Sequence, residues 1–229
     1  MKGAIMQPYF FPYIGYYQLV YEVKKFIFLD NVNYIKKGFI NRNSILLNGA
    51  RYDFAIPVLK VSQNRTINQH EYAGDFNVFL NSIKHGYKKA RNFEVAMSLI
   101  ESVVSDRDNN VARKNARSVM QVFDYLGILR NFSFSSTDEM DEALKGSDRI
   151  LAISGKHGID QYRNAIGGQN LYNHEEFKAA GIELKFIKSK ILPYPQGNHE
   201  FIPGLSMIDL LMNCDKEHIV SMLSEYTLV

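Results

Sequence analysis

The sequence has 229 residues and a nearly balanced charge, with 27 Lys and Arg against 24 Asp and Glu and a formal net charge of +3. Hydrophobic residues make up 46% and charged residues 22%, which is typical of a folded globular protein and excludes disordered, collagen-like and disulfide-scaffold classes. Because the net charge is weak, we expect no nucleic-acid partner.

The single cysteine and the distribution of apolar residues bear on where the protein works. Cys214 has no second cysteine with which to pair, which favours a reducing compartment. No apolar run approaches the ~18 residues of a membrane span, and Gln7, Pro8 and Pro12 break the first apolar stretch, which argues against a signal peptide. We therefore expect a cytoplasmic protein with no membrane span, folded as a single compact domain over residues 1–229.

The amino-terminal segment predicts a parallel βαβ unit. Residues 3–6 form a short apolar run typical of a buried strand, and the prolines that follow end it. A helix is expected to begin after Pro12 and to end at Lys24 and Lys25. Residues 26–29 predict a second buried strand, and two strands joined by a helix imply parallel pairing.

The next segment predicts a β-hairpin or meander. Short β-like runs occur at residues 34–35, 39–40, 44–47 and 52–58. Asn48-Gly49 lies between the last two runs and is a strong hairpin signal, because both residues tolerate positive φ.

From residue 75 onward the sequence is mostly helical. A helical subregion is expected over 75–127, its third helix opened by Asp106 or Asp108 and ended by Gly127. Further elements are expected in chain order: a strand at 132–134, a helix capped by Ser147 and ended by Gly155, a helix at 173–180, a strand at 182–187 and helices at 205–212 and 218–223, the last capped by Asp215. The fold class is α/β: an N-terminal parallel βαβ (Rossmann-like) unit with an inserted β-hairpin or meander and a mostly helical remainder.

The loop between the first strand and the first helix is the first candidate binding site. In open α/β sheets, ligands bind at the carboxyl ends of strands and at helix amino termini. The candidate binding residues there are Gln7, Pro8, Tyr13, Gly15 and Tyr16. A rigid aromatic plug over the core is the alternative interpretation of this loop.

The tripeptide Asn41-Arg42-Asn43 is the second candidate binding site. An arginine binds phosphate or carboxylate with two parallel hydrogen bonds, and the amides beside it both donate and accept. A solvated hairpin is the alternative.

Three titratable residues are candidates for catalysis. His85 lies in the basic stretch 84–91, whose alternative role is a solvated helix end. Asp30 follows the second predicted strand. Asp209 lies one turn inside an apolar helix that Ser206 begins, and a structural salt bridge is its alternative role. Ser206 is counted with the binding residues.

Metal binding is not predicted. The sequence carries none of the common metal motifs, and its six histidines show no metal-ligand spacing: His70, His85, His157, His174, His199 and His218. The cofactor is left open, and the substrate stays open between a nucleotide-linked sugar and ATP.

Taken together, these stretches resemble the WbqC family of bacterial proteins. The resemblance rests on an ordered series of residues: Ile5-Met6-Gln7-Pro8, Pro12, Gly15-Tyr16, Asp30, Asn41-Arg42-Asn43, Tyr162, Gly167-Gly168, Tyr172, Phe201, Leu205-Ser206, Ile208-Asp209-Leu210-Leu211 and Asn213. Tyr13 stands where that family often has Trp. The resemblance implies a place in surface polysaccharide gene clusters, especially in O-antigen assembly.

With the candidate residues, this resemblance leads to a functional hypothesis. We expect a transferase that acylates or aminoacylates the amine of a nucleotide-linked amino sugar. Tyr13 or Tyr16 would stack on the base, Arg42 would hold the diphosphate, and Asn41 and Asn43 would orient the sugar. His85, Asp30 or Asp209 would remove the proton from the amine. The alternatives are an ATP-using nucleotidyltransferase or ligase and a non-catalytic partner of a polysaccharide assembly complex, and a homo-oligomer is compatible with each.

Overall fold

The computed structural model describes residues 1–139, 141, 143–197 and 200–229. Its main feature is a six-stranded sheet with the spatial order β5-β2-β1-β6-β7-β8, in which only β8 runs antiparallel to its neighbour. The strands are β1 (Lys2–Met6), β2 (Lys25–Phe28), β5 (Asn131–Phe134), β6 (Gln161–Ala165), β7 (Glu183–Ser189) and β8 (Tyr226–Leu228).

The strand order has a reversal point between β1 and β6. The chain first builds outward from β1 to β2 and β5, and then returns to the other side of β1 to add β6, β7 and β8. Counted within the sheet, this is the order 3-2-1-4-5-6 of dinucleotide-binding folds, whose ligands lie at the carboxyl ends of the strands near the reversal. The topology therefore directs attention to the residues that follow β1, β2, β5 and β6.

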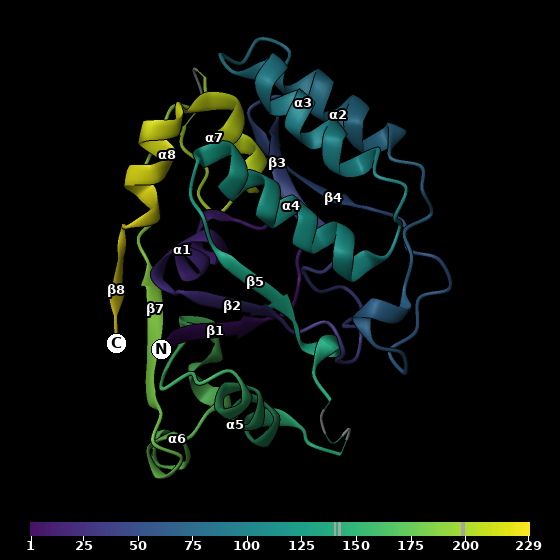
Figure 1. Ribbon diagram of the computed structural model, residues 1–229. Helices are drawn as coiled ribbons and strands as arrows, with labels where there is room; N and C mark the ends of the chain where they lie inside the picture. Colours follow the sequence, from purple (N-terminus) through teal and green to yellow (C-terminus); the bar gives the residue numbers. More distant parts are fainter. Residues whose placement is uncertain (140, 142, 198–199) are drawn as a thin grey trace.

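Helices cover both faces of the sheet (Figure 1). Helices α5 and α6 lie on one face and α1 lies on the other, together with the carboxyl-terminal helices. The helices are α1 (Ile14–Glu22), α2 (Asn77–Tyr87), α3 (Phe93–Val104), α4 (Val111–Leu126), α5 (Gly146–Lys156), α6 (His174–Ala179), α7 (Met207–Asn213) and α8 (Lys216–Leu223), with 3₁₀ turns η1 (Ile67–Gln69), η2 (Ser135–Thr137) and η3 (Ile166–Leu171).

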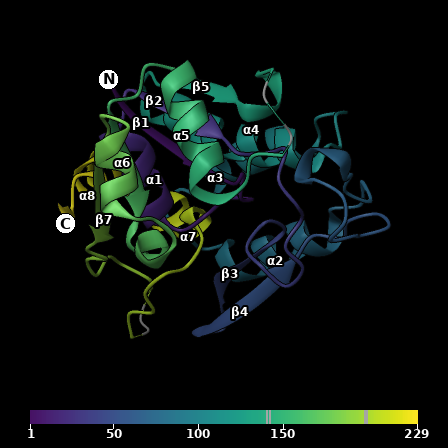
Figure 2. The same ribbon diagram turned by 90° about the horizontal axis from the view of Figure 1, so that it is seen from below.

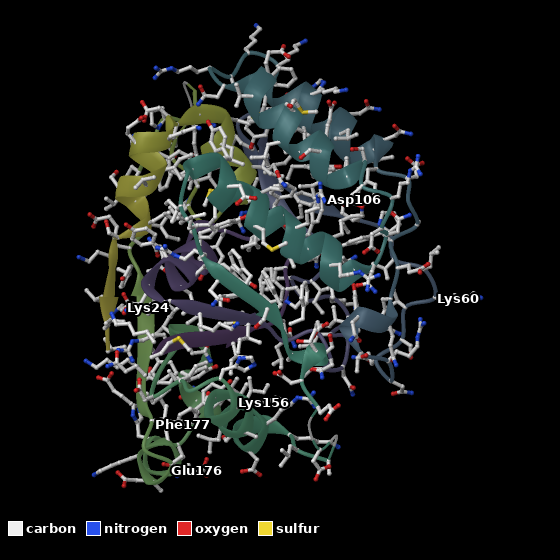
Figure 3. All side chains as sticks on the ribbon, in the orientation of Figure 1. Lys24, Lys60, Asp106, Lys156, Glu176 and Phe177 are labelled. Carbon is white, nitrogen blue, oxygen red and sulfur yellow. The ribbon has the colours of Figure 1, made fainter. Side chains whose placement is uncertain are left out.

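Side-chain alternation along the strands divides the core into two clusters. Phe26 and Phe28 of β2 belong to the larger cluster, on the α1 side of the sheet, whereas Ile27 between them belongs to the smaller one. Phe177 of α6 also belongs to the smaller cluster and is fully buried, while its neighbour Glu176 is exposed (Figure 3). Both faces of the sheet are thus covered, as is typical of parallel sheets.

A large insertion separates β2 from its neighbour β5. Residues 29–130 contain the hairpin β3 (Arg42–Leu47) and β4 (Ala50–Ala55) and the helices α2, α3 and α4. The hairpin and α2 lie together to one side of the sheet (Figure 2). The hairpin turns at Asn48-Gly49, both with positive φ, as the sequence predicted.

The predicted α/β class, the βαβ unit and the hairpin are confirmed, and several details differ. The first helix ends at Glu22, and Lys25 already belongs to β2. Helix α4 ends at Gly127 (φ +72°) as predicted. Its N-cap is Asn110, whose side chain accepts from the backbone N–H of Arg113, and Asp108 accepts from the backbone N–H of Asn110 just before the helix.

The remainder of the chain contains more strands than predicted. It contributes β5, β6, β7 and β8, of which β6 and β8 were not predicted. Helix α5 has Lys145 at its N-cap position, so Ser147 lies within the first turn and is not the cap. The caps predicted for the last two helices are confirmed: Ser206 accepts from the backbone of Ile208, and Asp215 accepts from that of His218.

Candidate functional site

The loop between β1 and α1 folds inward over the core. Phe10 and Phe11 are fully buried, and Phe11 has a positive φ of +40°. The ring of Phe10 packs edge-to-face on Phe11 and on Phe79 of α2, with centroid distances of 5.0 and 5.5 Å. The middle of this loop therefore joins the sheet to the inserted segment as an aromatic plug.

The amino end of α1 is covered by the segment that precedes α7. The hydroxyl of Ser206 donates to the carbonyl of Phe11 (2.6 Å), and the backbone N–H of Met207 donates to that of Pro12 (2.9 Å). Tyr13 and Ser206 also form an isolated β-bridge. In a dinucleotide-binding fold the pyrophosphate occupies this position. Here the protein's own chain lies there, and Ser206 is fully buried.

The other predicted binding residues of this loop differ in exposure. Tyr16 is 4% exposed and its hydroxyl donates to the carbonyl of Gln7 (2.9 Å), so its ring is closed to a ligand. Tyr13 is 37% exposed and keeps part of its ring open. A Cβ at Gly15 would collide with the Tyr13 ring and with Ser189, so Gly15 serves the packing of Tyr13.

A buried asparagine that the sequence did not single out fixes the start of the same loop. Asn115 of α4 donates to the carbonyl of Pro8 (3.0 Å) and to that of Ile40 (2.7 Å), and accepts from the hydroxyl of Tyr72 (2.6 Å). Its presence within the apolar stripe of α4 was the available signal, because a buried amide needs several partners. Pro8 is thus held from its carbonyl side and is itself buried.

Asn41 and Asn43 point into the protein, and Arg42 between them points out. Asn41 accepts from the hydroxyl of Tyr34 (2.7 Å) and donates to the carbonyl of Ile56 (2.7 Å). Asn43 donates to the carbonyl of Phe11 (2.6 Å). Neighbouring residues of a strand face opposite ways, so the two amides anchor the hairpin while Arg42 stays exposed.

Arg42 lines a cavity of 330 Å³ on one face of the hairpin, here called the Arg42 cavity. The strand register pairs Arg42 with Ala55 and Leu46 with Arg51, so the two arginines share that face. Lys37 lines the same cavity. The cavity therefore gathers three cationic side chains.

Among the described residues that line the Arg42 cavity, only one carries a carboxylate. Asp53 accepts a hydrogen bond from the hydroxyl of Ser44 (2.7 Å), its partner in the strand register. The guanidinium of Arg51 donates to the carbonyl of Pro203 (2.9 Å). Within the described ranges, no salt bridge involves the cations of this cavity. The cavity is electropositive and suits an anion.

His85 lies in a second cavity, of 850 Å³, between the carboxyl end of α2 and the hairpin turn. We call it the α2 cavity. Lys88, Lys89 and Arg91 line it with His85, and Asn48-Gly49 forms part of the opposite wall. Of the three predicted catalytic residues, His85 is the one that is exposed and lines a cavity.

Asp209 lies behind the wall of the α2 cavity and is closed to solvent. Its carboxylate accepts from the hydroxyl of Tyr87 (2.5 Å) and from the amide of Gln196 (2.9 Å), and both donors line the cavity. Burial raises the pKa of Asp209, against the lowering effect of these hydrogen bonds, and burial also raises the pKa of Tyr87 well above its usual range. The geometry suits Asp209 to orienting Tyr87 and Gln196.

Asp30 ties together the carboxyl ends of β2 and β5. It is 3% exposed, and its carboxylate accepts from the backbone N–H (2.9 Å) and hydroxyl (2.6 Å) of Ser136 and from the hydroxyl of Ser135 (3.1 Å). These bonds occupy its oxygens. Beside it lies a polar cavity of 740 Å³, to which Asn31 and Arg149 contribute.

The structure thus distributes the predicted site residues over separate places. Arg42 and His85 line two different cavities of the hairpin region, and Asp30 lies at the sheet edge. Among the described residues, no group of three or more His, Cys, Asp or Glu side chains could hold a metal ion, and His199 lies outside them. Nor does any described helix have the length and apolar character required to cross a membrane.

Comparison with known proteins places the chain in a family. It is 24% identical over 221 residues to the uncharacterized protein Rv1507c of Mycobacterium tuberculosis, a match that covers 94% of this chain and 95% of the relative. No solved structure matches the chain. The model of the WbqC-like protein family matches residues 7–221. The chain therefore belongs to the WbqC-like protein family.

Proposed function

We propose that the protein is a transferase of bacterial surface polysaccharide (O-antigen) biosynthesis that acylates or aminoacylates the amine of a nucleotide-linked amino sugar. The observation that carries the proposal is the Arg42 cavity, in which Arg42, Arg51 and Lys37 surround one space and outnumber the carboxylate of Asp53. A diphosphate matches such a set, because guanidinium groups bind phosphate oxygens in pairs.

The backbone of an exposed tyrosine lies close to the same strand. The backbone N–H of Ser206 donates to the carbonyl of Ser44 on β3 (2.8 Å), and Ser206 also bridges to Tyr13. Ser206 therefore lies between the backbone of Tyr13 and the strand that carries Arg42, and contacts both. A nucleotide whose diphosphate lies on Arg42 could stack its base on Tyr13, the role that the buried ring of Tyr16 cannot take.

The proton that the amine must lose needs an acceptor. Asp30 and Asp209 are buried, with their oxygens occupied by hydrogen bonds, whereas His85 is exposed. The proposal therefore assigns general-base catalysis to His85.

The test is calorimetry with a panel of nucleotide-linked amino sugars and with ATP, on the wild type and on Arg42→Ala. We expect one or more of the sugars to bind, and Arg42→Ala to weaken that binding about 10- to 100-fold, because hydrogen bonds to a charged group contribute about 1.5–3 kcal/mol. Arg107→Ala is the matched control, since Arg107 is exposed and lines none of the cavities described above.

Binding of no sugar in the panel would refute the proposal. If ATP alone binds, and the variant Arg42→Ala loses that binding, the result would instead support the nucleotidyltransferase or ligase alternative.

A further inference from the structure

The α2 cavity carries a concentration of positive charge that the proposed function uses only in part. Lys88, Lys89 and Arg91 line it beside His85, and none of the described residues in its lining is Asp or Glu. Arg91 has one acidic neighbour, Asp215, at 3.8 Å. Neither lysine forms a salt bridge within the part of the chain that the structure describes. The unbalanced charge belongs to a concave surface with room for a ligand.

The wall behind these cations is rigid. A Cβ at Gly86 would lie 2.8 Å from the carbonyl of Leu46, so α2 and β3 pack with backbone close to backbone. The hydroxyl of Tyr87 accepts from the N–H of Leu46 (2.8 Å) and donates to Asp209. This wall of the cavity is therefore held in place before any ligand arrives, which lowers the entropic cost of binding.

The opposite wall of the cavity, which includes Gln196, is hydrogen-bonded to the same carboxylate, that of Asp209. Gln196 donates to Asp209 (2.9 Å) and to the carbonyl of Ile202 (3.0 Å), and accepts from the N–H of Ile202 (2.7 Å). The side chain of Asn213 donates to the backbone carbonyl of Asp209 (2.8 Å). Buried Asp209 thus connects three polar residues of the lining, Tyr87, Gln196 and Asn213.

We infer that the α2 cavity is a second binding site, distinct from the Arg42 cavity, and that it takes the phosphate or diphosphate group of a small ligand. Lysine ammonium groups bind phosphate as point charges, and Asn213 adds a partly exposed amide to the lining. A transferase needs a donor as well as an acceptor, so a phosphorylated donor is one source of this group and free pyrophosphate is another. The weak net charge of the chain disfavours a nucleic acid here.

The test is a nuclear magnetic resonance titration of the whole protein with inorganic pyrophosphate. We expect saturable shifts of the amide signals of Gly49, Gly86 and Asn213, which surround the cavity. The double variant Lys88→Ala/Lys89→Ala should weaken the binding at least 10-fold. Lys84→Ala, in the last turn of α2 just before these lysines, is the matched control, because Lys84 pairs with Glu101 (3.3 Å) and lies outside the lining.

Further arms separate this site from the Arg42 cavity and identify the source of the phosphate. Arg42→Ala should leave the shifts at Gly86 unchanged, so failure of the proposed function and failure of this inference are distinguishable. Coenzyme A, a phosphorylated acyl carrier, should shift the same amide signals. If an acyl donor is the natural source of the phosphate, coenzyme A should bind at least 10-fold more tightly than pyrophosphate. No saturable shift at ~10 mM pyrophosphate, or equal affinity in the double variant, would overturn the inference.

Discussion

Lys114 of α4 is a buried cation whose partners are backbone oxygens. It is 1% exposed, and its ammonium group donates to the carbonyls of Val103 (3.2 Å), Val104 (3.3 Å) and Asp106 (2.9 Å) at the end of α3. Burial lowers the pKa of Lys114, and the carboxylates of Asp106 and Asp108 raise it. The residue acts as a cap at the negative end of the α3 dipole.

Lys114→Met should destabilise the fold by about 2–4 kcal/mol, because it leaves buried carbonyls without donors. Urea denaturation measures the change. Lys24→Met is the control, since Lys24 is exposed at the surface (Figure 3) and should change stability by less than about 0.5 kcal/mol. Equal effects of the two substitutions would show that capping by Lys114 contributes little.

The direction in which each side chain of Asn41-Arg42-Asn43 points could not be predicted from the sequence. The sequence predicts that Arg42 binds an anion, because guanidinium chemistry depends little on context, and this stays a prediction. It also suggests Asn41 and Asn43 as ligand contacts, whereas the structure engages both amides internally. Which of three neighbours faces outward depends on where the strand begins and which face packs on the core, and both are set by long-range contacts.

At the scale of elements, the connection between β4 and α2 is mostly irregular and depends on His70. This side chain is fully buried; its Nε2 accepts from the N–H of Ser62 (3.1 Å), and its Nδ1 lies 2.8 Å from the carbonyl of Thr66. The two contacts fit a neutral ring protonated on Nδ1. Burial lowers the pKa of His70 below its ordinary value of 6.5, although the hydrogen bond to Thr66 raises it.

The lowered pKa of His70 predicts the direction of a pH effect. Below pH 6.5 the unfolded chain takes up a proton that the folded protein resists, so the stability that His70 confers is complete above pH 6.5 and is lost as the pH falls below it. The difference in unfolding free energy between wild type and His70→Gln should therefore be largest at pH 7.5 and should shrink by pH 5. Urea titrations at both values test this, with exposed His218→Gln as control. A difference that grows on acidification would contradict the neutral assignment.

At the scale of the molecule, Glu22 connects α1 with three strands of the sheet. Its carboxylate accepts from Lys2 of β1 (2.8 Å) and Tyr226 of β8 (2.6 Å) and lies 3.6 Å from the guanidinium of Arg163 on β6. Burial raises the pKa of Glu22, but the hydrogen bonds from Lys2 and Tyr226 and the charges of Lys2 and Arg163 outweigh it, so the pKa lies below 4.5.

Glu22→Gln should lower the free energy of unfolding by about 1–3 kcal/mol at pH 7. A depressed carboxyl pKa confers stability that is present above pH 4.5 and is lost as the pH falls through the folded-state pKa, so the gap between wild type and variant should close toward pH 3. Glu175→Gln, on the exposed face of α6, is the control. A gap that persists at pH 3 would mean that packing, and not charge, explains the loss.

The overall architecture was predictable where local patterns are strong. The first βαβ unit, the Asn48-Gly49 hairpin and most helices follow from periodicity and caps. Strand β6 was missed because its sequence is polar, and Arg163 and Asn164 are buried only once β1 and β7 lie on either side. The strand order depends on such pairings and could not be predicted from local patterns.

The insertion between β2 and β5 has a consequence for how the chain folds. Residues 29–130 lie between β2 and β5 and must be spanned before β5 can pair with β2. This segment is about four times as long as an ordinary crossover connection. Two doublings of loop length cost only about 1.2 kcal/mol in closure entropy, so the equilibrium tolerates the insertion. The rate responds more strongly, because pairing between distant segments slows folding. The pairing of β6 with β1 bridges the still longer segment 7–160, so both pairings are expected to form late, after the first βαβ unit and the hairpin.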